Sequence, residues 1–478
     1  MGTNDQIQNL HVLILPYLTP SHMIPLVTIG RLFAARGVTV TILTTPCNAL
    51  LLRSSIDQDL VSDRKISIHE LTFPTKEVGL PEGIENFNAV TSSEMSTKVF
   101  YGIMLLRKPM EDFIRKLSPN CIFSDMFYPW TADLANELNI PRLMFYPSSF
   151  LYHCVTHSLS VYAPHDTVES ETESFLVPNL PHKIEMKRCQ LQEHVKVKTR
   201  YGELIKAIKE SEKKSYGMVH DTFYELEPAY TDHYGKVKKS KFWHIGPIFQ
   251  FFKKAETFRG SSFEQHYCLS WLDTQKPDSV LYICFGSIVR FSDAQLTEIA
   301  LALEASNIQF IWVVRKGVEL QETWLPSGFE ERMVKKNKGL LVREWVPQVK
   351  ILDHSSTGGF MTHCGWNSVL EAAVAGVPLV TWPLFAEQFY NEKLVELLKV
   401  GVRVGADVWN SGFEIESPLV GREMIENALS RLMDGSDESL MIRRRAQEIA
   451  HMARGAVLDA GSSLNQLTDL IEEMKALT

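Results

Sequence analysis

The sequence predicts an α/β fold made of two doubly wound domains that face each other across a cleft. Three observations carry this prediction: the chain has 478 residues, buried-strand patterns alternate with helix patterns in both halves, and a polar stretch separates the two series. A chain of this length exceeds one ordinary core, so more than one domain is expected. Parallel sheets bind ligands at the carboxyl ends of their strands, which would place a site in the cleft.

The first half begins with a strand–helix–strand unit. HVLILPY at residues 11–17 has a buried-strand pattern, residues 23–36 have an amphipathic helix pattern, and VTVTILT follows at 38–44. The handedness of such crossovers favours a parallel sheet. The alternation continues through an N-terminal domain that we place at residues 1–248, with further elements expected at 120–124, 130–138, 142–146 and 218–222.

A polar stretch of mixed charge, residues 249–265, is predicted to be the linker. A second strand–helix series then defines a C-terminal domain at 266–455, with elements expected at 279–285, 293–305, 309–314 and 340–342. The tail from 462 to 477 is predicted to be an amphipathic helix, because its apolar side chains share one stripe: Leu464, Leu467, Ile471 and Met474.

The composition, 45% hydrophobic and 22% charged, is that of a globular protein. The net charge of −8 gives no general attraction to nucleic acid or anionic lipid. The longest uncharged run, residues 143–164, contains prolines and histidines and is a poor membrane span. Seven scattered cysteines without a CxxC pair, and an N-terminus without a signal-peptide pattern, indicate a cytoplasmic protein. We expect it to be a monomer without integral membrane association.

The most informative stretch is residues 345–388. Within it, residues 358–362 are short, apolar and bounded by glycine, which suits a buried parallel strand. A turn follows, and then a helix is expected over 369–375, with Asn367 and Ser368 as N-cap residue types. The stretch therefore predicts a helix that starts at the carboxyl end of a parallel strand.

Such a helix start is an anion site, because unpaired backbone N–H groups and the helix dipole point at the ligand. His363, Asn367 and Ser368 would add hydrogen-bond donors for phosphate oxygens. Glu371 lies one turn beyond Asn367, where its carboxylate could accept hydrogen bonds from ribose hydroxyls. The residues thus predict an anion site for phosphate oxygens, with a carboxylate nearby for ribose hydroxyls.

Two residues of the first half point to acid–base chemistry at the same kind of sheet edge. His22 follows the first strand, and the near-neutral pKa of histidine suits proton abstraction from a hydroxyl. Asp125 closes another strand at that edge, so the two side chains can meet. A buried carboxylate bonded to the far ring nitrogen would fix the tautomer and stabilise the imidazolium.

The stretch 345–388 closely resembles the signature box of plant UDP-dependent glycosyltransferases of family 1, over its whole length. The resemblance implies the GT-B fold, with two Rossmann-like domains, an acceptor site in the first and the donor site in the second. It also suggests that a C-terminal helix within 456–478 crosses back to the first domain. The donor-site residues implied are Trp345, Val346 and Gln348 at the uracil or its sugar, Glu371 at the ribose, Ser287, His363, Asn367 and Ser368 at the diphosphate, Trp366, Glu387 and Gln388 at the transferred sugar, and Gly365.

His22 and Asp125 also fall where the family has its catalytic pair, in LPYLTPSHMIPL and CIFSDMFYPWTAD. Ser21 departs from the glycine that many relatives have before the histidine, which could narrow the acceptor entrance. The implied reaction is a direct, inverting displacement at the anomeric carbon of a UDP-sugar, without a metal or other cofactor. Asp57-Gln58-Asp59 matches the D-x-D pattern of metal-dependent glycosyltransferases, but we expect it to be solvated surface.

The family pattern favours glucose as the transferred sugar, because glutamine at the position of Gln388 accompanies UDP-glucose; galactose and glucuronic acid are the alternatives. Many relatives have a threonine near the position of Pro147 that contacts the sugar 6-hydroxyl, and Ser148 could replace it in this chain. The expected acceptor is an apolar small molecule, and the aromatic and methionine residues from the ligand edge of the first domain and across the cleft would suit a large one. The expected acceptor residues are Tyr17, Met126, Phe127, Tyr146, Ser148, Phe150 and Phe389.

Further segments resemble the subgroup that contains triterpenoid saponin glycosyltransferases, which also holds flavonoid and steroid enzymes; they include EVGLPEGIENF and SEKKSYGMVHDTFYELEPAY. A triterpenoid aglycone or its glycoside is therefore the expected acceptor, with flavonoids and steroids as alternatives. A nicotinamide-dependent oxidoreductase would need a G-x-G-x-x-G turn after a first strand, which neither half has. A non-catalytic nucleotide-sugar binder would not need both His22 and Asp125.

Overall fold

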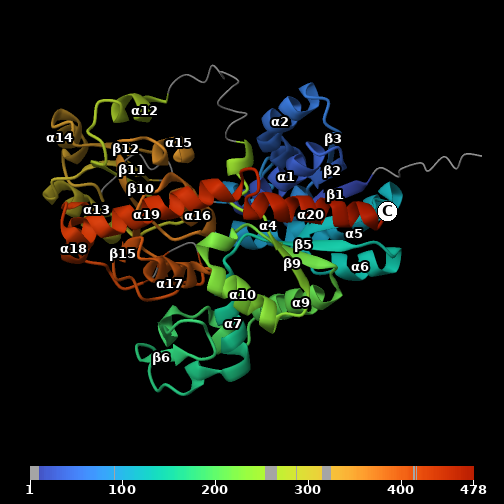
Figure 1. The fold of residues 1–478 in the computed structure, drawn as a ribbon. Coiled ribbons are helices and arrows are strands. Elements are labelled where there is room, and N and C mark those ends of the chain that lie inside the picture. Colours follow the sequence, from blue (N-terminus) through green and yellow to red (C-terminus); the bar gives the residue numbers. More distant parts are fainter. Residues whose placement is uncertain are drawn as a thin grey trace, which may run out of the picture.

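The computed structural model describes residues 10–90, 92–252, 266–286, 288–314, 324–412, 415 and 417–478. Most of the expected linker lies outside these residues. Within them the chain forms two parallel sheets with helices on their faces, one in each half of the sequence (Figure 1). The figure shows the two halves side by side, blue to green and yellow to red.

The N-terminal sheet has the strand order β3-β2-β1-β4-β5-β8-β9. Its strands are β1 (His11–Leu15), β2 (Thr39–Thr44), β3 (Ile66–Glu70), β4 (Cys121–Asp125), β5 (Arg142–Tyr146), β8 (Gly217–His220) and β9 (Lys241–His244). The helices of this half are α1 (Pro20–Ala34), α2 (Pro46–Val61), α3 (Thr75–Val78), α4 (Ser93–Leu105), α5 (Arg107–Leu117), α6 (Thr131–Leu138), α7 (Phe150–Tyr162), α8 (Glu193–Lys196), α9 (Arg200–Lys214) and α10 (Pro228–Val237). An antiparallel hairpin, β6 (Ser174–Val177) and β7 (Ile184–Lys187), projects from this domain, and short 3-10 turns include η1 (Phe87–Ala89), η2 (Pro164–Asp166), η3 (Arg188–Gln190) and η4 (Tyr224–Leu226).

The C-terminal sheet has the order β12-β11-β10-β13-β14-β15. Its strands are β10 (Val280–Cys284), β11 (Gln309–Val313), β12 (Gly339–Val342), β13 (Thr357–Thr362), β14 (Leu379–Thr381) and β15 (Gly401–Arg403). The helices are α12 (Tyr267–Leu272), α13 (Asp293–Ala305), α14 (Phe329–Lys335), α15 (Gln348–Leu352), α16 (Trp366–Ala375), α17 (Gln388–Leu398), α18 (Arg422–Met433), α19 (Asp437–Ala456) and α20 (Ser462–Ala476).

Local sequence explains where the elements that frame the cleft begin and end. β1 has four consecutive buried side chains, as expected of a strand covered on both faces, and Pro20 starts α1 at a position where a missing N–H costs nothing. Gly376 ends α16 in the left-handed conformation at φ 76°, as predicted for a C-terminal glycine. β5 and α13 have the predicted bounds at both ends.

The C-terminal helix α20 packs against the N-terminal domain. Figure 1 shows it, in red, running across the blue and cyan half, where it contacts β9. Leu467, Ile471 and Met474 of the predicted stripe are buried in the same cluster as β1 and β2, and Leu470 joins them. The hydroxyl of Ser463 donates to the carbonyl of Gly246. The chain therefore returns to its first domain after completing the second.

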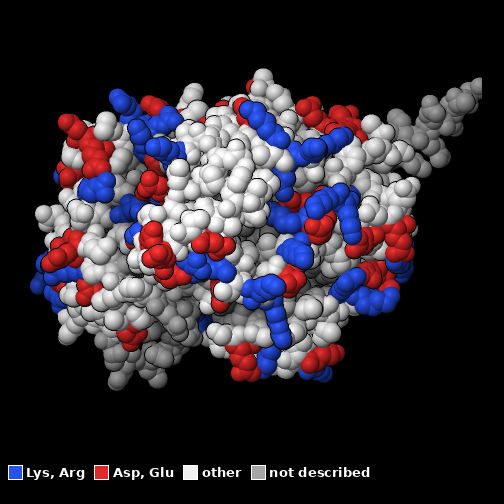
Figure 2. All heavy atoms as spheres, turned by 90° about the horizontal axis from the view of Figure 1, so that it is seen from below, with Lys and Arg blue, Asp and Glu red and all other residues white. Residues whose placement is uncertain are grey.

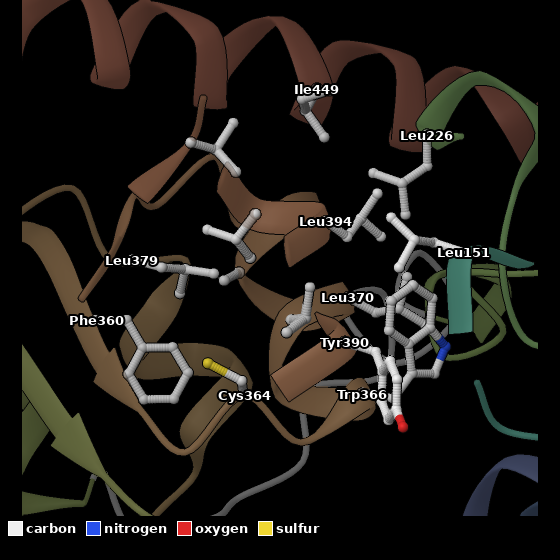
Figure 3. Packing of buried hydrophobic residues seen from close by; sticks show 14 of the residues in the cluster. Leu151, Leu226, Phe360, Cys364, Trp366, Leu370, Leu379, Tyr390, Leu394 and Ile449 are labelled. Atoms are coloured by element: carbon white, nitrogen blue, oxygen red, sulfur yellow. The ribbon is translucent and has the colours of Figure 1, made fainter. Parts of the chain in front are cut away.

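One apolar cluster is shared by the two domains behind the cleft. It contains Leu151 and Leu226 of the N-terminal domain together with Trp366, Leu370 and Tyr390 of the C-terminal domain. Figure 3 shows the indole of Trp366 beside Leu151 and Tyr390. Each Å² of apolar surface that this cluster removes from water contributes roughly 25 cal/mol, which stabilises the observed arrangement of the two domains.

Charged side chains are mixed on the surface. Figure 2 shows lysine and arginine interspersed with aspartate and glutamate on the face that it presents. Charged side chains of the surface form ion pairs, among them Lys214 with Asp133. Among the described residues, no helix is long and apolar enough to cross a membrane.

Candidate functional site

The candidate site lies where the strand order of each sheet reverses. In the N-terminal sheet this point is between β1 and β4; His22 lies in the first turn of α1 after β1, and Asp125 is the last residue of β4. In the C-terminal sheet it is between β10 and β13, which are followed by Gly286 and His363. Ligands of open α/β sheets bind outside the strand ends at such points.

His22 and Asp125 are hydrogen-bonded: Nδ1 of His22 lies 2.8 Å from Oδ2 of Asp125. Asp125 is fully buried, and its other oxygen accepts the backbone N–H of Phe127 at 3.0 Å. Burial disfavours the imidazolium, but the charge and hydrogen bond of Asp125, with a smaller effect of Glu387, raise the pKa of His22 above 6.5. With Nδ1 engaged, Nε2 is the ring nitrogen that can accept a proton.

Aromatic side chains surround His22. The rings of Tyr17 and Phe127 have centroids 6.1 Å and 5.3 Å from that of His22, and lie 4.7 Å from each other. Phe87 stacks on Tyr17 at 5.9 Å, and Met126 precedes Phe127 in the chain. Sequence reasoning missed Phe87 because it lies in the turn η1, away from any strand end; its one signal was the segment EGIENF.

Four of the expected acceptor residues are buried among core side chains in this structure: Tyr146, Ser148, Phe150 and Phe389. The Tyr146 hydroxyl donates to the Glu212 carboxylate, and the Ser148 hydroxyl lies 2.9 Å from Nε2 of His153. Phe150 and Phe389 are 0% and 1% exposed. Aromatic residues at the ends of buried strands fill cores as readily as pockets, and a sequence pattern does not separate the two cases.

The helix at the donor side, α16, begins earlier than predicted. Gly365 is its N-cap and Trp366 its first residue, so Asn367 and Ser368 lie within the first turn and do not cap it. Glycine is an acceptable N-cap, and here no side chain bonds the helix end. The backbone N–H groups of this turn therefore keep the character of an anion site.

His363 lies between two glycines that allow its position. A Cβ on Gly286 would lie 2.9 Å from the His363 ring, and a Cβ on Gly365 would lie 2.6 Å from it. Gly286 also has φ +83°, which other residues rarely adopt. Burial lowers the pKa of His363 to about 4, so the ring is neutral at physiological pH and can donate one N–H to a phosphate without carrying a charge.

Gln348 links the expected uracil and ribose residues. Its Nε2 donates to Oε2 of Glu371 at 2.6 Å, and its Oε1 accepts the hydroxyl of Tyr282 at 3.0 Å. The Nε2 group also lies 3.4 Å from Oγ of Ser368. Burial in the cleft raises the pKa of Glu371 to about 7, although the hydrogen bond from Gln348 lowers it. Tyr282, on β10, was not anticipated because nothing in its strand pattern marks it.

Trp345 is 69% exposed, whereas the neighbouring Val346 is 6% exposed. A tryptophan is seldom left so open to solvent, because its large apolar area favours burial. Its exposed indole, three residues before Gln348, is available to stack on a planar group.

Two hydrogen bonds join the donor side to the acceptor side. Nδ2 of Asn367 donates to the carbonyl of Ser21 at 3.0 Å, so the first turn of α16 touches the residue before His22. The indole N–H of Trp366 donates to the carbonyl of Asp221 at 2.6 Å, which buries the side chain between the domains. The indole N–H of Trp366 is therefore already engaged within the protein.

Glu387 and Gln388 lie at the start of α17. Burial raises the pKa of Glu387, while its own backbone N–H, the nearby His22 and the Asn391 side chain act against this. The buried Gln388 accepts the backbone N–H groups of Leu384 and Phe385 through Oε1 at 2.9 Å and 3.0 Å. Its Nε2 group is thus the end of the amide that can donate to a sugar hydroxyl.

Two further predictions concern Ser287 and the D-x-D triplet. Ser287, implied as a phosphate contact, lies outside the described residues. The D-x-D triplet is not solvated surface throughout, because Asp59 is 1% exposed and its carboxylate pairs with Arg31 and Arg64. Sequence spacing could not show this, because Arg31 comes from α1 and packs against α2 only in the folded domain.

Comparisons with known proteins agree with this geometry. The family model described as UDP-glucoronosyl and UDP-glucosyl transferase matches residues 262–435. Solanidine UDP-glucose glucosyltransferase 1 of Solanum tuberosum is 52% identical, with 98% of this chain and 97% of that protein covered. Nuatigenin 3-beta-glucosyltransferase of Solanum aculeatissimum is 54% identical, with 98% of each covered.

Among solved structures, a Glycyrrhiza uralensis UDP-glycosyltransferase complexed with glycyrrhetinic acid 3-O-monoglucuronide has a TM-score of 0.93 and 41% identity, with 98% of this chain and 96% of that chain covered. These matches confirm the GT-B fold, with its two Rossmann-like domains, and the resemblance found in the sequence. The chain belongs to the plant family 1 UDP-glycosyltransferases and is a UDP-dependent glycosyltransferase.

Proposed function

We propose that this enzyme transfers glucose from UDP-glucose, with inversion and without a metal, to a hydroxyl of an apolar triterpenoid aglycone or its glycoside. One observation carries the proposal: the hydrogen bond from Asn367 to Ser21 joins the phosphate side of α16 to the turn that holds His22. A leaving diphosphate and a general base would thus lie on either side of one reacting carbon. Placing two reactants in this way lowers the entropic part of the barrier.

In the proposed reaction, Nε2 of His22 takes the proton of the acceptor hydroxyl. The acceptor oxygen forms a bond to the anomeric carbon as the bond from that carbon to the diphosphate oxygen breaks, and the electron pair leaves with UDP. Asp125 stabilises the imidazolium that forms. His363, the Asn367 and Ser368 side chains and the first N–H groups of α16 would stabilise the negative charge on the departing diphosphate.

Glucose is proposed because Gln388 and Glu387 present an amide N–H2 and a carboxylate at one edge of the cleft, a pair suited to neighbouring equatorial hydroxyls. The relative from Solanum tuberosum is named for UDP-glucose. Ser148 is buried against His153 and is not assigned to the 6-hydroxyl. UDP-galactose and UDP-glucuronic acid are the donors to compare.

The acceptor is proposed to lie against Tyr17, Phe87, Met126 and Phe127, beside Nε2 of His22. Flat aromatic walls suit a rigid apolar skeleton. The crystal structure with glycyrrhetinic acid 3-O-monoglucuronide shows a related enzyme with an acceptor that already carries a sugar. The relatives named for solanidine and nuatigenin favour a steroid-type skeleton as the second candidate.

We propose a cytoplasmic location for this reaction. All seven cysteines are free thiols, and five of them are buried without a partner sulfur: Cys121, Cys154, Cys189, Cys268 and Cys364. Free thiols persist in a reducing compartment.

The test of this function is a product-mass assay with the purified enzyme. UDP-glucose, UDP-galactose and UDP-glucuronic acid are each offered with glycyrrhetinic acid and its 3-O-monoglucuronide, solanidine, nuatigenin and a flavonoid. A hexose adduct from UDP-glucose on the polycyclic acceptors is expected. Preference for another donor would contradict the assignment of glucose, and transfer to the flavonoid alone would contradict the acceptor class.

Replacing Trp345 with alanine is expected to weaken UDP binding about tenfold to a hundredfold, because stacking of a base on an aromatic ring contributes ~1–3 kcal/mol. Since Trp345 is 69% exposed, the melting temperature should stay nearly unchanged. Calorimetric titration with UDP checks this prediction. An unchanged affinity for UDP would show that the uracil does not stack on Trp345.

A further inference from the structure

The loop that carries Glu387, residues 384–388, holds one residue in a strained conformation. Ala386 has φ +49°, in the left-handed region that alanine rarely adopts. On one side the loop is held by Gln388, whose Oε1 accepts the N–H groups of Leu384 and Phe385. Strained backbone of this kind persists only where the surrounding contacts fix it, and it is common at ligand clamps.

The other side of the loop is held by the segment 407–410, which follows β15. The indole N–H of Trp409 donates to the carbonyl of Ala386 at 3.1 Å. Asn410 donates to the carbonyl of Leu384 twice, from its backbone N–H at 2.8 Å and from Nδ2 at 3.1 Å. The segment thus fastens the carbonyl groups on both sides of Phe385, as Gln388 fastens the N–H groups.

The same segment is bound to the N-terminal domain. The backbone N–H of Trp409 donates to the carbonyl of Cys189, in η3, at 2.9 Å. Asp407 accepts hydrogen bonds from Lys187, at the end of β7, and from Nε2 of Gln190 at 2.9 Å. The backbone and the side chain of Trp409 therefore hold the acceptor domain and the sugar-side loop at once.

We propose that residues 407–410 form a bridge through which the N-terminal domain positions the sugar-binding loop, with Trp409 as the positioning residue. The bridge follows a defined series of hydrogen bonds. Residues of β7 and η3 bond Asp407 and the backbone of Trp409, and the side chain of Trp409 bonds Ala386, the residue before Glu387. Through this bridge, the position of the sugar-binding residues depends on the contact between the two domains. This inference rests on the proposed role of Glu387 and Gln388 at the transferred sugar.

Trp409→Phe keeps an aromatic ring but removes the indole N–H that binds Ala386. The expected result is a dissociation constant for UDP-glucose that rises about threefold to tenfold, the usual effect of losing one hydrogen bond. The dissociation constant for UDP should change less than twofold, because Trp345, Gln348 and Glu371 lie outside the bridge. The matched control is Trp271→Phe, whose indole N–H bonds Asn337 at the surface of the same domain.

The test combines two measurements on the full-length enzyme. Calorimetry gives the affinities for UDP and UDP-glucose, and hydrogen–deuterium exchange follows the amides of residues 380–392. The proposal expects Trp409→Phe, but not Trp271→Phe, to speed exchange in this loop and to weaken UDP-glucose selectively. Unchanged exchange, or equal weakening of both ligands, would overturn it.

Gln388→Glu separates this outcome from a failure of the proposed function, because a carboxylate oxygen can still accept the N–H groups of Leu384 and Phe385 while the Nε2 donor is lost. If Gln388→Glu lowers the preference for UDP-glucose over UDP and Trp409→Phe does not, the bridge is wrong and the sugar contact stands. If Gln388→Glu leaves that preference unchanged, the assigned sugar contact is wrong, and exchange in Trp409→Phe still decides whether the bridge holds the loop.

Discussion

His22→Gln lowers the rate of sugar transfer by an expected ~10²–10⁴-fold, the usual cost of losing a general base. Glutamine preserves much of the volume and can still bond Asp125, but its amide does not accept a proton at neutral pH. The affinity for UDP should stay unchanged, because the donor contacts come from the other domain. Initial rates of product formation, with UDP titrations alongside, check this expectation.

The matched control is His69→Gln. His69 lies on β3, an edge strand of the same domain's sheet, and stacks on Phe113. Its replacement should leave the rate within twofold of the wild type. Transfer by His22→Gln at more than a tenth of the wild-type rate would show that another group removes the proton.

Asp125→Asn is the second large effect, with an expected loss of ~10²–10⁴-fold in kcat/KM, because the imidazolium loses its buried counter-charge. The asparagine has nearly the same shape and can still accept the Phe127 N–H, which Asp125 accepts at 3.0 Å. A folding defect should therefore be small, and a melting curve serves as the control.

The pH profile distinguishes this role from a structural one. His22 must be neutral to act as a base, so activity is lost as the pH falls through its pKa. Asp125 raises that pKa above 6.5, and burial alone would lower it. The acid limb of kcat/KM should thus lie above pH 6.5 in the wild type and move to lower pH in Asp125→Asn. If the acid limb of kcat/KM stayed at the same pH in Asp125→Asn, Asp125 would not be the group that raises the pKa of His22.

The sequence predicts local structure well where hydrophobic periodicity is strong. β5 and α13 have their expected bounds, and β1, β2 and β13 are found within a residue or two. Such elements follow from burial on both faces of parallel sheets, which leaves a signal in each strand. The stretch around His363 and Glu371 was equally informative, because its donors and helix start are close together in the chain.

Boundaries and contacts that depend on distant residues were not predictable. Asn367 and Ser368 are N-cap types, yet Gly365 takes that position because the chain must turn tightly around His363. Asp59 looks like a surface residue until α1 brings Arg31 against it. In each case a tertiary contact outweighs a local preference.

The acceptor residues show most clearly what a sequence pattern cannot predict. Tyr146 is the last residue of β5 and Phe127 comes two residues after β4, at the same edge of the sheet. Tyr146 bonds Glu212 inside the domain, whereas Phe127 lies beside the His22 ring. The bridge through Trp409 depends on residues some 220 positions away, at Lys187 and Gln190, and has no local signature. Which side chains face the cleft is decided by packing between elements.

The central claim is a single displacement at the anomeric carbon with His22 as base. The most direct test is the anomeric configuration of the product, read from the proton NMR coupling of the new glycosidic linkage. From the α-linked glucose of UDP-glucose, the β-glucoside is expected as the only product. Formation of the α-glucoside would contradict the account, because retention requires a second displacement or an internal return that this site is not proposed to perform.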